Sequence, residues 1–210
     1  MRTEDLINAL AADPPAVRPG PGALLPLAAG IAIMILGYGI LLDARPDIAE
    51  AARSAAFILK LAAAALLAVA AAGTLVRLAR PGRSIGPWPY ALLLPILLLG
   101  GGVVATIAGT PASDWGARLV GTNALACLTV IPALAAAPLA GAIVWLRSRA
   151  PTRPASVGAL AGILAGSLAA VLYGTTCIDD SPLFVATWYS LAITTVAAAG
   201  ALLGQRFLRW

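Results

Sequence analysis

The sequence predicts an all-α, polytopic membrane protein: a bundle of six transmembrane helices preceded by a short amphipathic, cytoplasmic N-terminal helix. Hydrophobic residues make up 60% of the 210 residues and charged residues only 11%, whereas soluble domains carry about 25% charged residues. The apolar residues fall in long runs, each near the ~20 residues that cross a hydrocarbon core. Because the connections are short, consecutive helices are expected to pack as antiparallel neighbours.

Six apolar runs give the expected membrane spans. They are Gly22–Leu42, Ser54–Val76, Pro89–Gly109, Val120–Leu146, Ser156–Thr176 and Leu183–Gly204. The fourth run contains Pro132 and Pro138, so we expect it to be kinked or tilted. The first run is too long for the apolar part of a signal peptide and has no clear cleavage site, so we expect it to stay in the mature protein.

The spans divide the chain into three parts. Residues 1–21 form the cytoplasmic N-terminal helix and a Pro/Gly linker, residues 22–204 the six-helix transmembrane domain, and residues 205–210 a cytoplasmic tail.

Arginine is distributed unevenly over the predicted loops. The even-numbered loops and the two termini hold ten arginines, against three in the other loops. The ten are Arg2, Arg18, Arg77, Arg80, Arg83, Arg147, Arg149, Arg153, Arg206 and Arg209. This is the positive-inside pattern, and it predicts a multi-pass protein of a bacterial inner (plasma) membrane with both termini in the cytoplasm. The net charge of +5 is thus explained by the orientation of the protein. We expect the lipid bilayer as a partner and no direct contact with nucleic acid.

The sequence offers no catalytic constellation. It contains no histidine, which excludes Ser-His-Asp and Cys-His arrangements and imidazole metal ligands. It also contains no C-x-x-C pair and no glycine-rich phosphate loop after a strand. We therefore expect no enzymatic activity and no resident cofactor.

One charged residue lies inside a predicted span. Lys60 is expected roughly 9 Å below the outer end of the second span, and a lysine stem can snorkel that far to meet Asp43, Glu50 or Asp114. The alternative is a functional intramembrane ion site. With the glycine-rich bundle, such a site would fit a small-solute transporter or channel subunit.

Three glycines form one stripe on the fifth span. Gly158, Gly162 and Gly166 follow each other at intervals of four residues, so a neighbouring backbone can approach this face closely. Packing within the bundle is the expected use of the stripe, and a homo-oligomer is the alternative.

The two cysteines are expected at the same, periplasmic end of the bundle. Cys127 lies in the fourth span about 10 Å from the outer face, and Cys177 closes the fifth span just before Asp179 and Asp180. A periplasmic face permits disulfides, and two thiolates with two helping carboxylates can hold a soft metal ion transiently. The alternative is that Cys127 is a small buried hydrophobe and Cys177 an ordinary loop residue.

The first ten residues are expected to include a short amphipathic helix. Thr3 can cap it, acidic residues in its first turn suit the helix dipole, and Leu6, Ile7 and Leu10 form one apolar stripe. The acidic residues disfavour an anionic membrane surface. A groove on a protein is therefore the favoured docking site for this helix.

The chain resembles the NrsF family of six-helix membrane anti-sigma factors. The matching pieces, in chain order, are T-E-D-L-I at 3–7, L-A-A-D at 10–13, R-P-G at 80–82, Cys127, C-I-D-D-S-P-L-F-V-A-T-W-Y at 177–189, Gly204 and L-R-W at 208–210. Each piece is short, but their order and the two cysteines make the resemblance specific over the whole chain.

The resemblance implies a regulatory function. Members of this family negatively regulate extracytoplasmic-function sigma factors in proteobacteria. Their cytoplasmic portions hold the sigma factor at the membrane until a stress sensed outside releases it. For this chain, the resemblance implies an extracytoplasmic-function sigma factor as partner. We expect the N-terminal helix to bind it through Asp5, Leu6, Ile7 and Leu10.

The resemblance also implies the signal. Family members respond to heavy metals such as chromium and cadmium, and two cysteines that matter for this response correspond to Cys127 and Cys177. Many relatives have histidine immediately before the second cysteine, where this chain has Thr176. A metal site here would therefore use thiolate and carboxylate ligands only.

Overall fold

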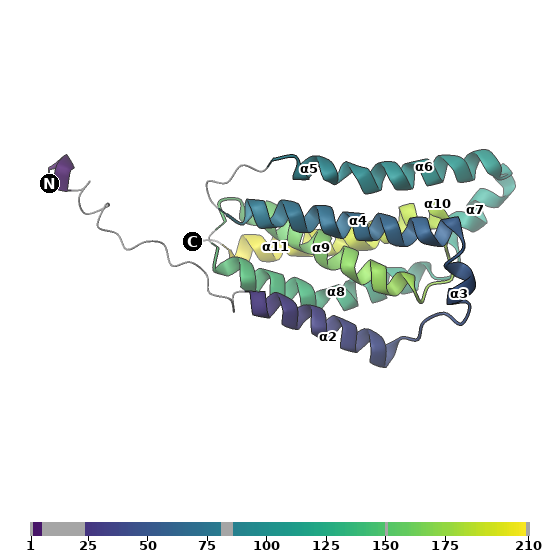
Figure 1. Ribbon diagram of the computed structural model, residues 1–210, viewed down its shortest axis with the longest axis horizontal. Helices are drawn as coiled ribbons and strands as arrows, with labels where there is room; N and C mark the ends of the chain where they lie inside the picture. Colours follow the sequence, from purple (N-terminus) through teal and green to yellow (C-terminus); the bar gives the residue numbers. More distant parts are fainter. Residues whose placement is uncertain (1, 6–23, 81–85, 150, 209–210) are drawn as a thin grey trace.

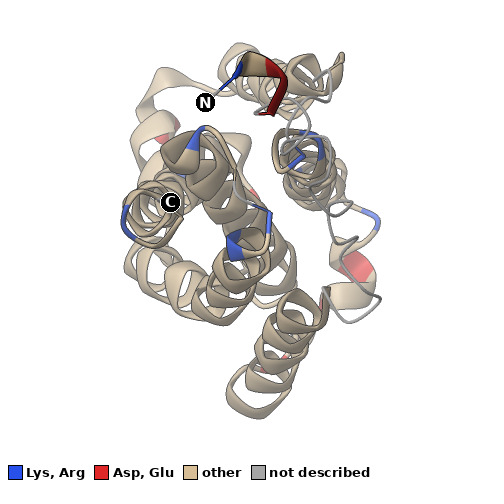
Figure 2. Ribbon diagram, turned by 90° about the vertical axis from the view of Figure 1, so that its left-hand side faces the viewer, with Lys and Arg blue, Asp and Glu red and all other residues tan. Residues whose placement is uncertain are grey.

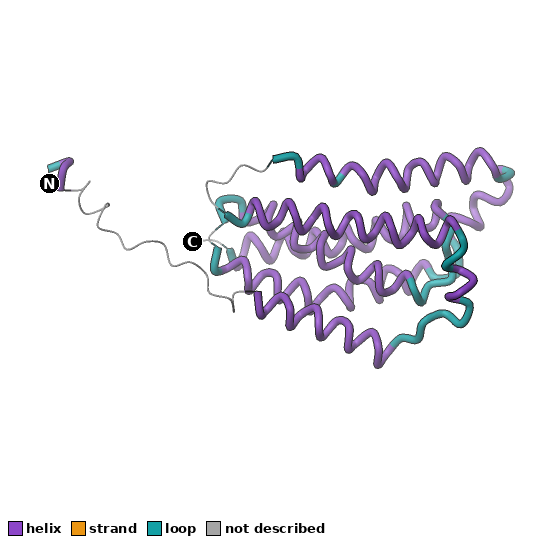
Figure 3. Tube along the Cα trace, in the orientation of Figure 1, coloured by secondary structure: helices purple, strands orange, loops and turns teal. Residues whose placement is uncertain are grey.

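The computed structural model describes residues 2–5, 24–80, 86–149 and 151–208. Within these residues every regular element is a helix (Figure 3), which confirms the all-α prediction. The long helices run along one common axis (Figure 1). Five helical stretches are long and apolar enough to cross a membrane: Ala55–Leu78, Trp88–Gly109, Ala112–Arg147, Pro154–Gly174 and Pro182–Phe207.

The predicted runs and the observed helices agree closely in position. The second and fifth runs correspond to α4 (Ala55–Leu78) and α9 (Pro154–Gly174), and the third to α5 (Trp88–Ala91) with α6 (Leu93–Gly109). The sixth is divided into α10 (Pro182–Phe184), a π-helical turn η2 (Val185–Tyr189) and α11 (Ser190–Phe207).

The first run forms a shorter helix than a full span. α2 (Leu25–Leu41) has 17 residues, which is about 25 Å, against a hydrocarbon core of ~30 Å. Six apolar helical stretches thus occupy the six predicted runs, and five of them have the length of a span. The count of six membrane crossings stays a prediction.

Two of the predicted connections contain unexpected helices. A short helix α3 (Ile48–Ala51) follows α2, and α7 (Ala112–Val120) precedes α8 (Ala124–Arg147). Gly121 separates α7 from α8 with a positive φ of 56°, which favours glycine. The predicted start of the fourth span at Val120 is therefore about one turn too early, because Val120 still belongs to α7.

α9 lies at the centre of the bundle and packs against α11, α4 and α8 (Figure 1). Its glycine stripe faces α11: a Cβ at Gly158 would lie 2.2 Å from the Gly200 carbonyl oxygen, and one at Gly162 2.4 Å from the Val196 carbonyl oxygen. The two backbones are in direct contact there, so the stripe is used for packing within the bundle. This face is not free for a homo-oligomer.

The expectation that consecutive helices are neighbours is wrong for two pairs, α2 with α4 and α6 with α8. α6 packs mainly on α4 rather than on α8. α2 packs mainly on α8 rather than on α4. Glycines on both helices permit this contact, because Gly30 lies against the Ala137 carbonyl and Gly141 against the Pro26 carbonyl. Pro138, which lies inside α8 without ending it, belongs to the same contact.

The outward faces of α2 and α6 are apolar and exposed. The exposed large side chains there are Ile33, Ile35, Leu36, Ile40, Leu41, Leu93, Leu94, Ile96, Leu97, Leu98, Val104 and Ile107. Soluble monomers rarely expose contiguous apolar patches of this kind. This surface fits contact with lipid, in agreement with the long apolar helices.

Candidate functional site: a thiol pair beside a buried charge cluster

The segment from Thr175 to Ser181 connects α9 to α10 and lies at one end of the bundle with residues 42–54 and 110–123. We call this the Cys177 end. The backbone N–H of Arg45 donates to the Thr175 carbonyl at 3.1 Å, and the hydroxyls of Tyr38 and Thr175 are 2.6 Å apart. The connection after α2 is thereby tied to the segment that carries Cys177.

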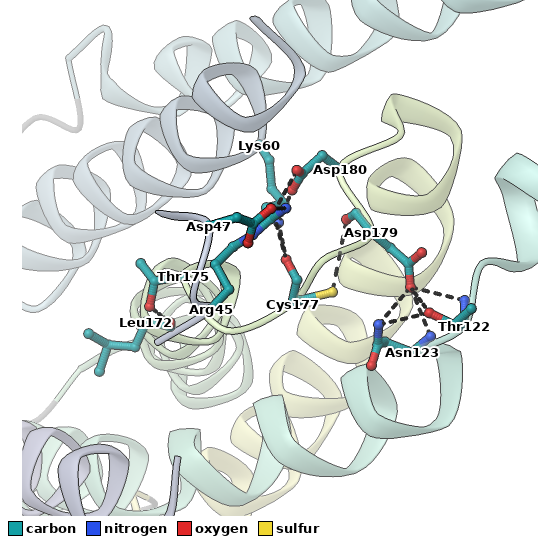
Figure 4. Close-up of polar contacts among 10 residues, drawn as sticks. All are labelled: Arg45, Asp47, Lys60, Thr122, Asn123, Leu172, Thr175, Cys177, Asp179 and Asp180. Atoms are coloured by element: carbon teal, nitrogen blue, oxygen red, sulfur yellow. Dashed lines mark hydrogen bonds and ion pairs between the residues drawn. The ribbon is translucent and has the colours of Figure 1, made fainter. Parts of the chain in front are cut away.

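Four ionised side chains form a charge cluster beside Cys177 (Figure 4): Arg45, Asp47, Lys60 and Asp180. Lys60 Nζ lies 2.5 Å from Asp180 Oδ1 and donates to the Cys177 carbonyl at 2.9 Å. The Arg45 guanidinium lies 2.7 Å from Asp180 Oδ2 and 2.7 Å from Asp47 Oδ1. Its hydrogen bond to Asp47 is the main cause that lowers the pKa of that carboxyl.

Lys60 therefore does not pair with Asp43, Glu50 or Asp114, and that expectation is wrong. Its side chain is 0% exposed, and a charge buried to this extent must be paired and hydrogen-bonded. The Cys177 segment supplies both a carboxylate and a carbonyl oxygen, so the ammonium is satisfied inside the protein.

Asp179 points away from the charge cluster (Figure 4). One of its carboxylate oxygens accepts the backbone N–H groups of Thr122 at 3.0 Å and Asn123 at 2.8 Å, and also their side chains. Burial would raise the pKa of Asp179, but the hydrogen bonds from Asn123 and Thr122 outweigh it and lower that pKa. Asp179 thus ties the Cys177 segment to the start of α8.

The first turn of α8 carries Cys127, which is 0% exposed, and Cys177 is 2% exposed. Both thiols are free. The pKa of Cys177 is lowered to about 7, chiefly by its hydrogen-bonding interaction with the Cys127 thiol, while burial opposes this shift and the Lys60 charge adds to it. The two thiols are therefore neighbours, and we call them the thiol pair.

Cys127 lies closer to the start of its helix than the predicted span, which begins at Val120, implies. Because α8 begins at Ala124, Cys127 lies in its first turn, with its N–H bonded to the Asn123 carbonyl. The Cys177 segment is held over this turn by Asp179, so the two cysteines meet without a deep cleft.

The surroundings of the thiol pair limit what it can bind. In the part of the chain that the structure describes, no three Cys, Asp or Glu side chains are grouped to hold a metal ion. Asp179 and Asp180 were expected to help bind a metal ion, but their carboxylates have other partners. Asp179 accepts hydrogen bonds from Thr122 and Asn123. Asp180 forms ion pairs with Lys60 and Arg45. Two thiols alone suit a disulfide or a two-coordinate soft ion rather than zinc, which takes three or four protein ligands.

The predicted sigma-factor contacts fall mostly outside the described residues. Leu6, Ile7 and Leu10 all lie there. Asp5 is described: it is exposed, residues 3–5 are helical, and its carboxylate accepts the Arg2 backbone N–H at 3.2 Å. Binding through these four residues stays a prediction.

Sequence reasoning missed several residues around the thiol pair: Arg45, Thr122, Asn123, Tyr173 and Tyr189. One signal was available, since the lone charge in the spans, Lys60, requires a partner and few acidic residues share its end of the bundle. Asp180 is one of them.

The two features that favoured a transporter are explained by packing and pairing. Lys60 is neutralised by Asp180, and the glycine stripe is covered by α11. The fold and site define a helical bundle with a thiol pair and a charge cluster at one end, in which five described helical stretches are long and apolar enough to cross a membrane.

Comparison with known proteins gives its family. Residues 10–210 match the family described as "Negative regulator of sigma F". The chain is 33% identical to "Probable anti-sigma-F factor NrsF" of Azospira oryzae and 34% identical to "Anti-sigma-F factor NrsF" of Caulobacter vibrioides, over 100% of both chains in each case. This chain therefore belongs to the NrsF family, as the resemblance predicted. No solved structure matches it.

Proposed function

We propose that this chain is a membrane anti-sigma factor that sequesters an extracytoplasmic-function sigma factor at the bacterial inner membrane. The observation that carries the proposal is its similarity, over the full length of both chains, to two relatives named anti-sigma-F factors. Because the similarity extends over the membrane helices and not only over the termini, the whole architecture is expected to serve the same regulatory task.

The arrangement of the arginines supports a division of labour between the two ends of the bundle. α2 begins and α11 ends at the end opposite Cys177 (Figure 1), which we call the Arg149 end. Its described residues are 77–80, 86–87, 147–149, 151–153 and 205–208. Figure 2 is viewed from this end and shows Lys and Arg on several helices. By the positive-inside rule, the Arg149 end faces the cytoplasm and holds the sigma factor, together with the stripe of Leu6, Ile7 and Leu10.

The Cys177 end then faces the periplasm and receives the signal. In this proposal a heavy-metal ion or an oxidant acts on the thiol pair, by soft-ion binding or disulfide formation. The segment that carries Cys177 is bound to the connection after α2, to α4 and to α8 through Arg45, Lys60 and Asp179. A change at the thiols therefore reaches three helices that run to the Arg149 end, and roughly 5.5 kcal/mol would switch the holding and releasing forms almost completely.

The first experiment tests sequestration. The full chain is purified from membranes, and the bound sigma factor is identified by mass spectrometry. Leu6→Asp and Ile7→Asp should lose the sigma factor, because each places a charge in an apolar contact. Asn8→Asp adds the same charge beside the stripe and is the matched control. If Leu6→Asp retains as much sigma factor as Asn8→Asp, the N-terminal stripe is not the main contact.

The second experiment tests sensing. Cys127→Ser and Cys177→Ser should each abolish induction of the regulated genes by metal or oxidant while repression stays intact. Because both thiols belong to one site, the double variant should behave like the single ones. Thr176→Ser changes the neighbouring residue without touching a thiol and should respond normally. Induction that persists in the double variant would contradict the proposal.

A further inference from the structure

The turn that follows the Cys177 segment in the sixth helical stretch is unusual. Residues Val185–Tyr189 form a single π-helical turn between α10 and α11, and such turns are frequent at functional sites. The turn is fixed from two sides: Trp188 Nε1 donates to the Leu119 carbonyl at 2.8 Å, and the ring of Phe184 meets that of Tyr189 edge-on at 6.4 Å between centroids. The direction of the Tyr189 side chain is therefore set by the turn.

Tyr189 points into the region of the thiol pair. Its side chain is buried, with 2% of the residue exposed, and its ring lies 6.1 Å from that of Tyr173. A Cβ built on Gly174 would lie 3.9 Å from the Tyr189 hydroxyl oxygen and 3.7 Å from Lys60 Cε. The hydroxyl thus lies near the Lys60 stem and near Gly174, which precedes Cys177 by three residues.

This hydroxyl lacks an ordinary partner. Among the described residues it forms no hydrogen bond of normal length, yet it is close enough to the Cys177 thiol to influence it. Buried hydroxyls are nearly always hydrogen-bonded. A neutral thiol is a weak acceptor, whereas a sulfur that carries negative charge is a strong one. The hydroxyl is thus placed to donate a hydrogen bond to the Cys177 sulfur when that sulfur carries negative charge during its reaction.

We propose that Tyr189 is a positioning residue of the thiol pair: its hydroxyl donates a hydrogen bond to the reacting Cys177 sulfur and holds that sulfur toward Cys127. This inference rests on the proposed function, because it names a third group of the same site. The other polar groups that face Cys177 are Cys127, Tyr173, Lys60, Arg45 and the Asp179 carbonyl. Of these groups, the Tyr189 hydroxyl is the one that is buried without a bond of normal length.

The test follows disulfide formation in the purified, reduced, full-length chain in detergent micelles, with diamide as oxidant. Two thiols give up two electrons and two protons, the S–S bond forms, and diamide is reduced to the hydrazine. Tyr189→Phe should slow the reaction about tenfold, which corresponds to about 1.4 kcal/mol, close to the lower limit for one hydrogen bond to a charged group. The matched control is Tyr38→Phe, which removes a hydroxyl bonded to Thr175 in the same segment and should leave the rate unchanged.

A spectroscopic measurement separates positioning from a general loss of structure. The infrared S–H stretching band of Cys177, assigned by its absence in Cys177→Ser, should shift in Tyr189→Phe and stay in place in Tyr38→Phe. If Tyr189→Phe does not fold, the same band is measured in a Tyr173→Phe chain grown with fluorotyrosine. The Tyr173→Phe change removes the neighbouring tyrosine hydroxyl. The fluorinated Tyr189 hydroxyl is a stronger donor and should shift the band further.

Three outcomes would overturn the proposal: an unchanged rate and band in Tyr189→Phe, an equal effect in Tyr38→Phe, or slowing in Tyr173→Phe alone. No sigma factor is used in these measurements, so their failure is distinguishable from failure of the proposed function. A slowed reaction in Tyr189→Phe, combined with normal induction by oxidant in cells, would support the role of Tyr189 and contradict sensing through the thiol pair.

Discussion

The two ends of the bundle use charge in opposite ways. At the Cys177 end, oppositely charged side chains meet inside the protein, and all three ion pairs found among the described residues lie there. At the Arg149 end, Arg77 and Arg149 lie over the rings of Trp88 and Trp145, 5.9 Å and 5.1 Å from the centroids. The segments that make up this end contain no acidic residue.

This difference indicates what each end is for. A buried ion pair is favourable only when both partners have good geometry. The ion pairs at the Cys177 end therefore fix three parts of the chain relative to one another: the connection after α2, the helix α4 and the Cys177 segment. Among the described residues, no acidic side chain pairs with an arginine of the Arg149 end. These charges are therefore available to lipid head groups or to a bound protein.

The largest expected effect tests the orientation on which this comparison depends. A reporter that is active only in the periplasm should work when fused after Asp114 and fail when fused after Arg83 or Arg149, because the arginine-rich segments stay in the cytoplasm. The measurement is reporter activity at equal fusion levels. The reverse pattern would place the thiol pair in the cytoplasm and break the proposed direction of signalling.

The next prediction breaks the charge cluster. Lys60→Met should lower the free energy of unfolding by about 3 kcal/mol, because a buried pair that loses one partner leaves the other uncompensated. Arg45 still pairs with Asp180 in this variant. The expected loss of stability is therefore at the lower end of the range for breaking a buried ion pair. Thermal unfolding in detergent micelles measures it.

Arg53→Met is the matched control, since Arg53 is an exposed residue of the same end and exposed charges contribute little. Equal stability of the two variants would show that the charge cluster does not hold the Cys177 end together.

The sequence predicts the positions of the helices well and their partners poorly. Long apolar runs locate each long helix within a few residues, because a segment that is to cross lipid needs about 20 such residues whatever the packing. α7 was missed because Asp114 and Arg118 interrupt the apolar pattern over its nine residues.

Contacts between distant segments could not be read from local patterns. Lys60 and Asp180 lie 120 residues apart, and α2 reaches α8 only because Gly30 and Gly141 admit a neighbouring backbone. The order of the spans predicts that the two cysteines lie at the same end of the bundle. It does not predict which residues surround Cys177, because these depend on how one short segment is bound to three helices.

The smallest expected effect concerns the bond between the Cys177 segment and α8. Asp179→Asn keeps the shape of the side chain but removes the charge that four donors of Thr122 and Asn123 face. The free energy of unfolding should fall by about 1 kcal/mol, the usual loss when a helix start loses its acceptor. Asp114→Asn, at an exposed position of the same end, should have no measurable effect.

The pH dependence of stability gives the same bond a second test. Hydrogen bonds lower the pKa of Asp179 in the folded chain below its ordinary value of 3.8. Its contribution is therefore complete at pH values well above 3.8 and is lost as the pH falls through the lowered value, because the folded state then has to take up a proton that the unfolded state already binds. Asp47, whose pKa is lowered by Arg45, contributes in the same direction in the unmodified chain and in Asp179→Asn.

The measurement is unfolding in detergent micelles between neutral and acidic pH. The difference in stability between the unmodified chain and Asp179→Asn should shrink below about pH 4. Two curves that stay parallel down to the most acidic pH would mean that the Asp179 charge does not hold the Cys177 segment on α8.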